Sequence, residues 1–315
     1  MDKFILSVLL IIGGLTTGAF LKPVLNRHNS FLSDNLGKWL QKIAVFYLIP
    51  LIALGAVWAA RIEDYRLILL PGLGTFTVVS GGIAGLFFSR LLKHGPKQKG
   101  PMFLCGGFSN FGSFGGFISY MLWGEQSYAF VALIKLLDEV NLVTIGYPVA
   151  KYFAQGNPRI NWEQIRKYLL DPVFIIPVTA VLSGLTLNLL KWERPPFFEG
   201  LNGFLIPATT LVATGLNLKL ASLRLYLREC IAISLIKFLF LPVVVGTIAW
   251  ILGLHRIDQG LPFKVLLVLT SMPVAFYSQI PPAIYDLDRD LASSCWLFTT
   301  GLMLLLLPVI FMVLI

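Results

Sequence analysis

Long apolar segments follow one another through almost the whole chain, and they constrain its fold more than any other feature. A helix that crosses the hydrocarbon core of a membrane needs about 20 mostly apolar residues. Ten segments meet this requirement, and short connections separate them. We therefore predict an all-α membrane protein with ten transmembrane helices, at residues 4–25, 38–60, 67–89, 101–123, 128–153, 169–190, 201–220, 227–254, 263–285 and 291–315.

Composition supports a lipid-facing surface. Of the 315 residues, 57% are hydrophobic and 13% are charged, about half the charged fraction of roughly 25% in soluble proteins. The net charge of +9 could suggest a nucleic-acid partner, but the basic residues are scattered through short loops instead of gathering on one face. We expect the lipid bilayer, and no nucleic acid, as a partner.

Neither a metal nor another cofactor is indicated. The three cysteines, Cys105, Cys230 and Cys295, form no CxxC pair, and we expect them to be small buried residues. The three histidines show no metal-ligand spacing. We expect no metal site and no cofactor.

The distribution of lysine and arginine predicts the orientation in the membrane. Odd-numbered loops hold sixteen of these residues and even-numbered loops hold six. Since cytoplasmic loops carry the excess of positive charge, the odd loops should be cytoplasmic. Both termini would then be extracytoplasmic, in a multi-pass protein of the plasma (inner) membrane.

Two short sequence matches between the halves of the chain suggest an internal repeat. Gly14-Leu15-Thr16 in the first span matches Gly184-Leu185-Thr186 in the sixth, and Leu48-Ile49-Pro50 in the second matches Leu205-Ile206-Pro207 in the seventh. Five helices are an odd number, so a second unit of five would enter the membrane from the opposite side, as in many transporters. We predict two inverted five-helix repeats, 1–154 and 169–315, joined by a cytoplasmic connection at 155–168.

Two spans at matching places in these repeats contain helix-breaking residues. The fourth has five glycines between residues 106 and 116, among them Gly115 and Gly116, and the ninth has Pro281 and Pro282. Interrupted helices in both halves indicate a binding site at the membrane midplane, where the N-termini of half-helices favour an anion. The alternative is that the glycines only permit close helix packing.

Charged residues lie deep inside two spans. The fifth contains Lys135, Asp138 and Glu139, which would share one face of a continuous helix. They could couple transport to a proton or to sodium, balance the charge of a substrate, or form a structural ion pair between Lys135 and either acid. In the eighth span, Lys237 could attract an anion, neutralise an acid of the fifth span, or extend to the cytoplasmic surface.

These residues lead to a family resemblance. The C-terminal part resembles the auxin efflux carrier family, which includes plant PIN proteins and bacterial malate or malonate permease-like proteins. Asn110, Gly112 and Gly115 are similar to that family's glycine-rich element, and residues 45–50 are similar to its second helix. The matching positions near the C-terminus are Pro273, Tyr285, Asp288, Ala292-Ser293, Thr300 and Pro308.

The resemblance implies ten helices in two inverted repeats, with a scaffold part of helices 1, 2, 6 and 7 and a transport part of helices 3–5 and 8–10. It implies elevator-like motion and organic-anion substrates, and it is compatible with a homodimer. Three positions depart from the family pattern. Ser109 replaces a glycine, Phe117 replaces the proline of the fourth helix, and Tyr277 replaces an asparagine.

The function expected from all of this is secondary transport of a small carboxylate. Residues Ser109, Asn110 and Gly112 would bind it opposite Tyr277, Ser278 and Gln279. A sodium-coupled transporter of the bile-acid type and a non-transporting membrane receptor remain alternatives. An intramembrane enzyme is not expected, because no histidine lies in a span and no HExxH occurs.

Overall fold

The computed structural model describes residues 43–60, 62, 64–156, 170–198 and 226–314, together with the single residues 13, 39, 163 and 166. Every element named in this part of the chain is a helix, as the sequence predicts. The predicted spans at 4–25 and 201–220, and most of the connection at 155–168, lie outside the described residues.

Short helical segments follow closely on one another up to residue 155. Pro50 and Pro71 occupy the first turns of α2 and α3, where an amide proton is not needed for the helix. The segments are η1 (Ala44–Leu48), α2 (Ile49–Ala59), η2 (Tyr65–Leu69), α3 (Leu70–Leu91), α4 (Pro96–Gly107), η3 (Phe111–Gly115), α5 (Gly116–Trp123), α6 (Glu125–Lys135), α7 (Asp138–Asn141), η4 (Leu142–Gly146) and α8 (Tyr147–Gln155).

The rest of the described chain contains one long helix on its own and then a second series. The connection between α14 and α15 turns through Gly253 and Gly260, both with positive φ. The segments are α10 (Pro172–Leu189), α13 (Leu227–Leu235), η6 (Ile236–Phe240), α14 (Leu241–Ile251), η7 (Leu254–Arg256), η8 (Asp258–Gly260), α15 (Leu261–Thr270), η9 (Phe276–Gln279), α16 (Ile280–Ile284) and α17 (Arg289–Leu314).

Three helical runs in the described chain are long and apolar enough to cross a membrane, namely Tyr65–Leu91, Leu227–Ile251 and Arg289–Pro308. They correspond to the predicted third, eighth and tenth spans. Two shorter apolar helices, Phe46–Ala59 and Ile175–Leu189, correspond to the second and sixth. The predicted fourth, fifth and ninth spans are each divided into shorter segments, so none of them is a single long helix.

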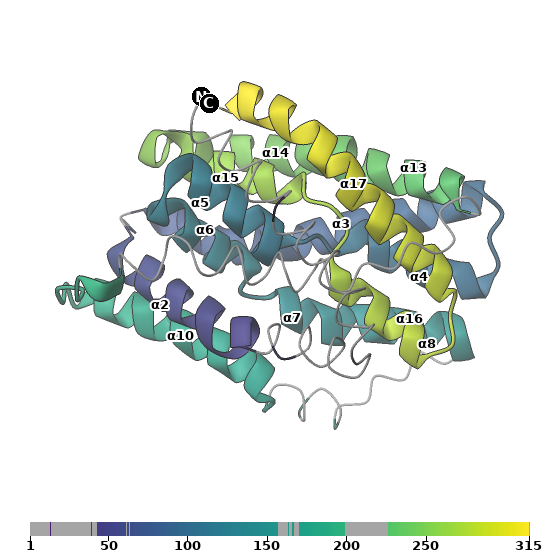
Figure 1. The fold of residues 1–315 in the computed structure, drawn as a ribbon, viewed down its shortest axis with the longest axis horizontal. Coiled ribbons are helices and arrows are strands. Elements are labelled where there is room, and N and C mark those ends of the chain that lie inside the picture. The colour runs from purple at the N-terminus through teal and green to yellow at the C-terminus, as the bar shows by residue number, and fades with distance from the viewer. Residues whose placement is uncertain are drawn as a thin grey trace.

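Glycine allows α3 and α4 to pack backbone against backbone. A Cβ atom added to Gly81 would overlap the carbonyl oxygen of Gly106, and one added to Gly85 would overlap that of Met102. Close contact through small residues is a common way to pair helices in membranes. In a separate pair, Gly184 of α10 brings that helix against Leu54 of α2. Figure 1 shows α2 and α10 side by side along the lower left edge.

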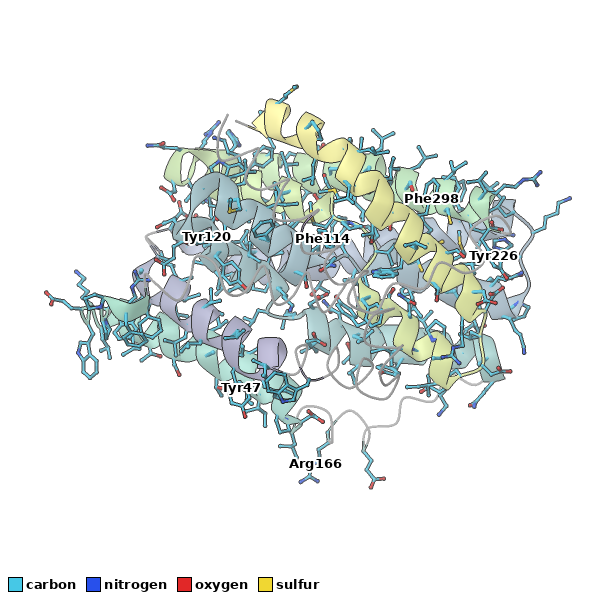
Figure 2. All side chains as sticks on the ribbon, in the orientation of Figure 1. Tyr47, Phe114, Tyr120, Arg166, Tyr226 and Phe298 are labelled. Atoms are coloured by element: carbon cyan, nitrogen blue, oxygen red, sulfur yellow. The ribbon has the colours of Figure 1, made fainter. Side chains whose placement is uncertain are left out.

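The interior is filled by apolar side chains from most of the helices. Phe114 and Phe117 are buried with Met272 and Met303, which links η3 and α5 to the segment after α15 and to α17. In Figure 2, Phe114 lies in the middle of the bundle, whereas Tyr226 lies toward one end of it. Phe114 is fully buried, so the segments around it belong to the interior of the described structure.

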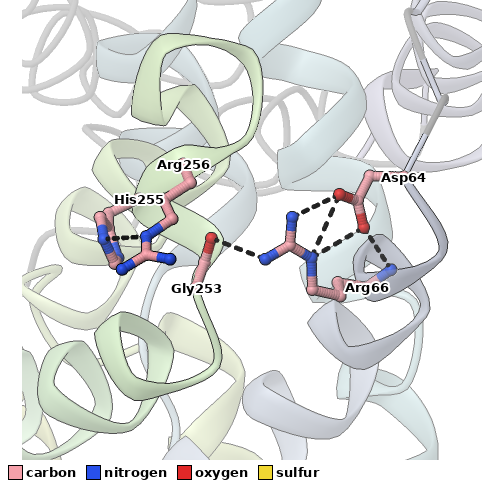
Figure 3. Close-up of polar contacts among 5 residues, drawn as sticks. All are labelled: Asp64, Arg66, Gly253, His255 and Arg256. Atoms are coloured by element: carbon pink, nitrogen blue, oxygen red, sulfur yellow. Dashed lines mark hydrogen bonds and ion pairs between the residues drawn. The ribbon is translucent and has the colours of Figure 1, made fainter.

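Contacts between loops divide into two groups. Arg194 pairs with Glu125, and Gln126 donates to Asp258, so the predicted even-numbered loops contact one another. Arg66 likewise donates to the carbonyl of Gly253, as Figure 3 shows. The second group joins predicted odd-numbered loops or the helix ends beside them, through the pairs His94–Glu229, Lys97–Asp286 and Tyr226–Asp288.

Candidate functional site

The predicted fourth span is interrupted after Gly107. Phe108 is extended, with φ −85° and ψ 123°, and Asn110 is also non-helical, with φ −77° and ψ 66°. Helical structure resumes at Phe111 with the π-helical turn η3. Three residues, Phe108 to Asn110, therefore cross the middle of this span without forming helix.

The predicted ninth span is interrupted in the same manner. Helix α15 ends at Thr270, and the next turn, η9, begins at Phe276. Between them, Ala275 is extended, with φ −69° and ψ 140°. Pro273 lies in this gap and cannot donate a backbone hydrogen bond.

The two interruptions pair with each other. The amide of Asn110 donates to the carbonyl of Pro273 over 2.8 Å, and the amide of Ala275 donates to that of Phe108 over 3.1 Å. Together they form an antiparallel bridge between Ser109 and Val274. Inside a membrane, unwound backbone needs partners within the protein, and here each gap supplies them to the other.

The interruptions begin earlier than the sequence analysis placed them. Gly115 and Gly116 are helical, at the junction of η3 and α5, where they leave room for the side chains of Leu269 and Tyr128. Pro281 and Pro282 lie within α16, in its first turn, where a missing amide does not weaken the helix. These four residues therefore serve packing and helix initiation, and they do not themselves form the gaps.

Lys237 is buried beside the paired segments. Its side chain is fully buried, and its Nζ donates to Ser109 Oγ over 2.8 Å. It belongs to the π-helical turn η6, a kind of bulge that often occurs at functional sites. The alternative that Lys237 extends to the cytoplasmic surface is therefore wrong, because Ser109 holds the ammonium group in the interior.

Asp138 is the second buried charge, and 2% of its surface is exposed. Its Oδ2 accepts a hydrogen bond from the hydroxyl of Tyr277. Its Oδ1 is buried, and no described residue donates to it. Burial is the main factor that disfavours the charge of this carboxylate, Glu139 also repels it, and the ammonium groups of Lys135 and Lys237 attract it. The carboxylate therefore connects the fifth span to the turn that follows the gap in the ninth.

The fifth span is itself interrupted beside its charged residues. Helix α6 ends at Lys135 and α7 starts at Asp138, with a turn at Leu136 and Leu137 between them. The predicted single helical face for the three charges is therefore wrong. The Lys135 ammonium lies against Gly112, 3.0 Å from where a Cβ would stand.

The other predicted binding residues lie in the gaps or in the turns that follow them. Asn110 Oδ1 accepts from the amide of Ser113 over 3.2 Å, and Ser278 Oγ donates to the carbonyl of Ala275 over 2.7 Å. Gln279 Oε1 accepts from Ser293 Oγ over 2.9 Å. Its Nε2 is buried and has no partner in the described structure. Gln279 therefore retains an unused donor near the crossing.

Helix α17 supplies polar groups that the sequence analysis did not include in the site. Thr299 Oγ1 accepts from the amide of Val274, over 3.2 Å, and so supports the gap in the ninth span. Ser294 and Thr300 have buried hydroxyls for which the described residues offer no partner. The available signal was a series of hydroxyl residues in an apolar helix, namely Ser293, Ser294, Thr299 and Thr300.

The expectation for the cysteines is confirmed. Cys105, Cys230 and Cys295 are all reduced and buried. Across the residues that the structure describes, no cluster of three or more His, Cys, Asp or Glu side chains could hold a metal ion.

The described structure combines apolar helices, two paired interruptions in these helices, and buried charges beside the interruptions. This combination is typical of one class of protein, the membrane transporters. Comparison with known proteins gives the family. Residues 24–311 match the family described as membrane transport protein, and the chain therefore belongs to this family, that of the auxin efflux carriers. The resemblance noted in the sequence is confirmed.

Two archaeal relatives are similar over most of their lengths. An uncharacterised transporter of Methanothermobacter thermautotrophicus is 25% identical over 284 residues, covering 88% of this chain and 89% of its own. Another, from Methanocaldococcus jannaschii, is 24% identical over 230 residues, 72% of each chain. The family and the relatives are described as transporters, which agrees with the expected membrane location.

Proposed function

We propose that this protein is a secondary transporter that moves a small carboxylate across the plasma membrane by an elevator-like alternating-access mechanism. The observation that carries the proposal is the pairing of two interrupted helices beside the buried ammonium of Lys237. A buried charge inside a membrane protein is costly. A binding site for an anion gives a reason for keeping a cation there.

The proposed architecture has ten helices in two inverted repeats, residues 1–154 and 169–315. Two observations support it. The gaps in the fourth and ninth spans meet in antiparallel register, as segments related by an inverted repeat would. Contacts among the described loops also respect the division into odd and even loops, which fits alternate loops on opposite faces of the membrane.

In the proposed mechanism, helices 1, 2, 6 and 7 form a scaffold, and helices 3–5 and 8–10 form the moving part. The packing of α2 along α10 supports this division, since they represent the second and sixth spans. The two paired gaps both belong to the moving part. Because they are hydrogen-bonded to each other, they would travel together with the substrate.

The substrate would bind where the gaps meet. Two helical runs begin there, at Phe111 and at Phe276, and a helix start favours a negative group. Lys237 would supply a full positive charge, and Asn110 and Gln279 would supply amide groups. Ser109, Gly112, Tyr277 and Ser278 would shape the rest of the site.

Uptake into liposomes tests this function. The purified protein would be reconstituted and offered radiolabelled pyruvate, malonate, malate, succinate and indole-3-acetate. We expect at least one to accumulate faster than in protein-free liposomes, and the Asn110→Ala and Gln279→Leu variants to lose most of that uptake. Gln155→Leu is a matched control, because Gln155 is exposed at the end of α8.

Two alternatives correspond to distinct outcomes of the same assay. Uptake that requires an inward sodium gradient would support a sodium-coupled transporter of the bile-acid type. Binding of a carboxylate without any flux into sealed liposomes would support a membrane receptor. Full uptake by both site variants would remove Asn110 and Gln279 from the mechanism.

A further inference from the structure

We propose that transport is coupled to protons, and that Asp138 binds the proton when the carboxylate of the substrate becomes the counter-ion of Lys237. This inference rests on the proposed function and adds the coupling ion and the residue that binds it.

The first step concerns the free capacity of Lys237. An ammonium group has three hydrogen-bond donors. Within the described part of the chain, its one acceptor is Ser109 Oγ, which belongs to the bridge between the two gaps. The remaining donors are available to a carboxylate at the crossing.

The second step concerns Asp138 when the site is empty. Its buried carboxylate has one hydrogen bond, from Tyr277, and an Oδ1 atom that no described residue satisfies. A buried ionised group with so few hydrogen bonds depends on nearby opposite charge. Burial is the largest influence on this group and favours its neutral form, whereas the attraction from Lys135 and Lys237 favours the ionised form. The carboxylate is therefore sensitive to any change in how these cations are neutralised.

The charged and titratable groups around Asp138 come from four segments. They are Lys135 of α6, Glu139 of α7, Lys237 of η6 and Tyr277 of η9. Helix α3 also packs against α7 and contributes the uncharged Thr75, which accepts from Asn141. Burial, two cations and one further acid thus determine the charge state of Asp138.

These neighbours favour a proton over sodium as the coupling ion. A sodium ion bound at Asp138 would be a third cation close to Lys135 and Lys237, and charge repulsion in a buried site is strong. A proton bound to Oδ1 neutralises the carboxylate and adds no separate cation.

The coupling follows from competition for Lys237. When a substrate carboxylate binds to the ammonium group, it neutralises the attraction that stabilised ionised Asp138. Asp138 then binds a proton from the side to which the site is open. After the moving part changes sides, the carboxylate leaves, Lys237 attracts Asp138 again, and the proton is released there. Each cycle moves one proton with one anion, so a monocarboxylate crosses without net charge.

The test uses the liposomes and the carboxylate panel described above. For wild type we expect an inward gradient of one pH unit to drive about tenfold accumulation of a transported monocarboxylate, as one coupled proton permits. An imposed membrane potential should not change this accumulation, and replacement of sodium by choline should not either. Asp138→Asn should reduce the ratio of uptake with and without the pH gradient to about one.

Two further variants keep the test decisive if Asp138→Asn fails to fold. Tyr277→Phe removes the hydrogen bond that stabilises ionised Asp138, so half-maximal uptake should occur at higher pH. Asp290→Asn is the matched control, because Asp290 is an exposed acid at the start of α17, and its pH response should equal that of wild type.

The outcomes separate the two proposals. Uptake that ignores the pH gradient, or that follows a sodium gradient, would overturn proton coupling while leaving carboxylate transport intact. An unchanged pH response in both Asp138→Asn and Tyr277→Phe would exclude Asp138 as the proton site. The absence of uptake of any panel member by wild type would overturn the proposed function, and proton coupling with it.

Discussion

The Nζ atom of Lys237 lies 2.8 Å from the Oγ atom of Ser109, which joins a buried cation to the unwound backbone of the fourth span. Ser109 replaces a glycine of the family pattern, and Tyr277, which donates to Asp138, replaces an asparagine. Two of the three departures from that pattern thus form hydrogen bonds to the two buried charges.

Removal of the Ser109 hydroxyl should destabilise the protein. In Ser109→Ala, the buried ammonium group loses its one acceptor among the described residues, and an unsatisfied buried polar group costs about 1–3 kcal/mol. Thermal unfolding in detergent would measure the loss. In a Lys237→Met background the same substitution should cost much less, since the charge that needs the hydroxyl is gone.

Ser80→Ala provides the control for this prediction. The Ser80 hydroxyl donates only to backbone carbonyls of its own helix, those of Phe76 and Thr77. Its removal should change stability by a few tenths of a kcal/mol at most, as for a surface substitution. Equal losses of stability in Ser80→Ala and Ser109→Ala would show that the hydrogen bond to Lys237 does not contribute to the stability of the folded protein.

The contact between α3 and α4 should not tolerate even one methyl group at Gly81. A Cβ there would overlap the carbonyl oxygen of Gly106, and backbone atoms cannot rotate away. Overpacking of this kind costs about 1–3 kcal/mol, so we expect Gly81→Ala to lower the midpoint of thermal unfolding. Gly72→Ala is the matched control on the same helix, because no atom lies within 4 Å of its added Cβ. A neutral Gly81→Ala would contradict the close contact.

Local composition predicted that the fourth and ninth spans are interrupted, but it did not predict where. Several glycines and prolines compete within each span, and only tertiary contacts decide which of them lie outside a helix. Pro273 is in a gap, whereas Pro281 and Pro282 begin a helix. Both placements satisfy the restrictions on proline, so the sequence alone could not distinguish them.

The hydrogen-bond and ion-pair partners of the charged residues inside the spans could not be predicted from the sequence, for a related reason. Helical periodicity put Lys135 and Glu139 one turn apart, but the turn at residues 136 and 137 breaks that relation. The partner of Lys237 is 128 residues away, so no local pattern identifies it. The existence and depth of these charges could be predicted, because apolar spans make charged residues conspicuous.

Outside the spans, the pair of Asp64 and Arg66 should make stability depend on acid. Hydrogen bonds from Arg66 hold the pKa of Asp64 below its ordinary value of 3.8. Because the pKa of Asp64 is lower in the folded protein than in the unfolded chain, the pair stabilises the folded protein at pH values above 3.8. This contribution is lost as the pH falls through the pKa of the folded state.

Asp64→Asn tests this dependence. The difference in unfolding temperature between this variant and wild type should be present at neutral pH and should shrink below pH 3.8. Arg66→Gln should weaken the same dependence, since it removes the guanidinium shown in Figure 3 but keeps the bond from the backbone amide of residue 66. A difference that stays constant down to acidic pH would show that ionisation of Asp64 does not contribute.

The ion pair between Arg194 and Glu125 should resist motion in the proposed elevator. Arg194 follows α10 and also donates to the carbonyl of Gly55 in α2, over 3.1 Å. Glu125 begins α6, which belongs to the proposed moving part. Since the pair joins the scaffold to that part, it stabilises the present arrangement and must break when the parts slide past each other.

Glu125→Gln should therefore increase the exchange of labelled for unlabelled carboxylate across liposomes. A partly exposed pair contributes up to about 1 kcal/mol, which corresponds to an increase of about two- to fivefold in rate if the pair is broken in the transition state. Asp286→Asn is the matched control, because the pair of Asp286 with Lys97 lies within the moving part and should leave the rate unchanged. Equal rates in both variants would mean that the Arg194–Glu125 pair does not have to break during transport, and the boundary between scaffold and moving part would then have to lie elsewhere.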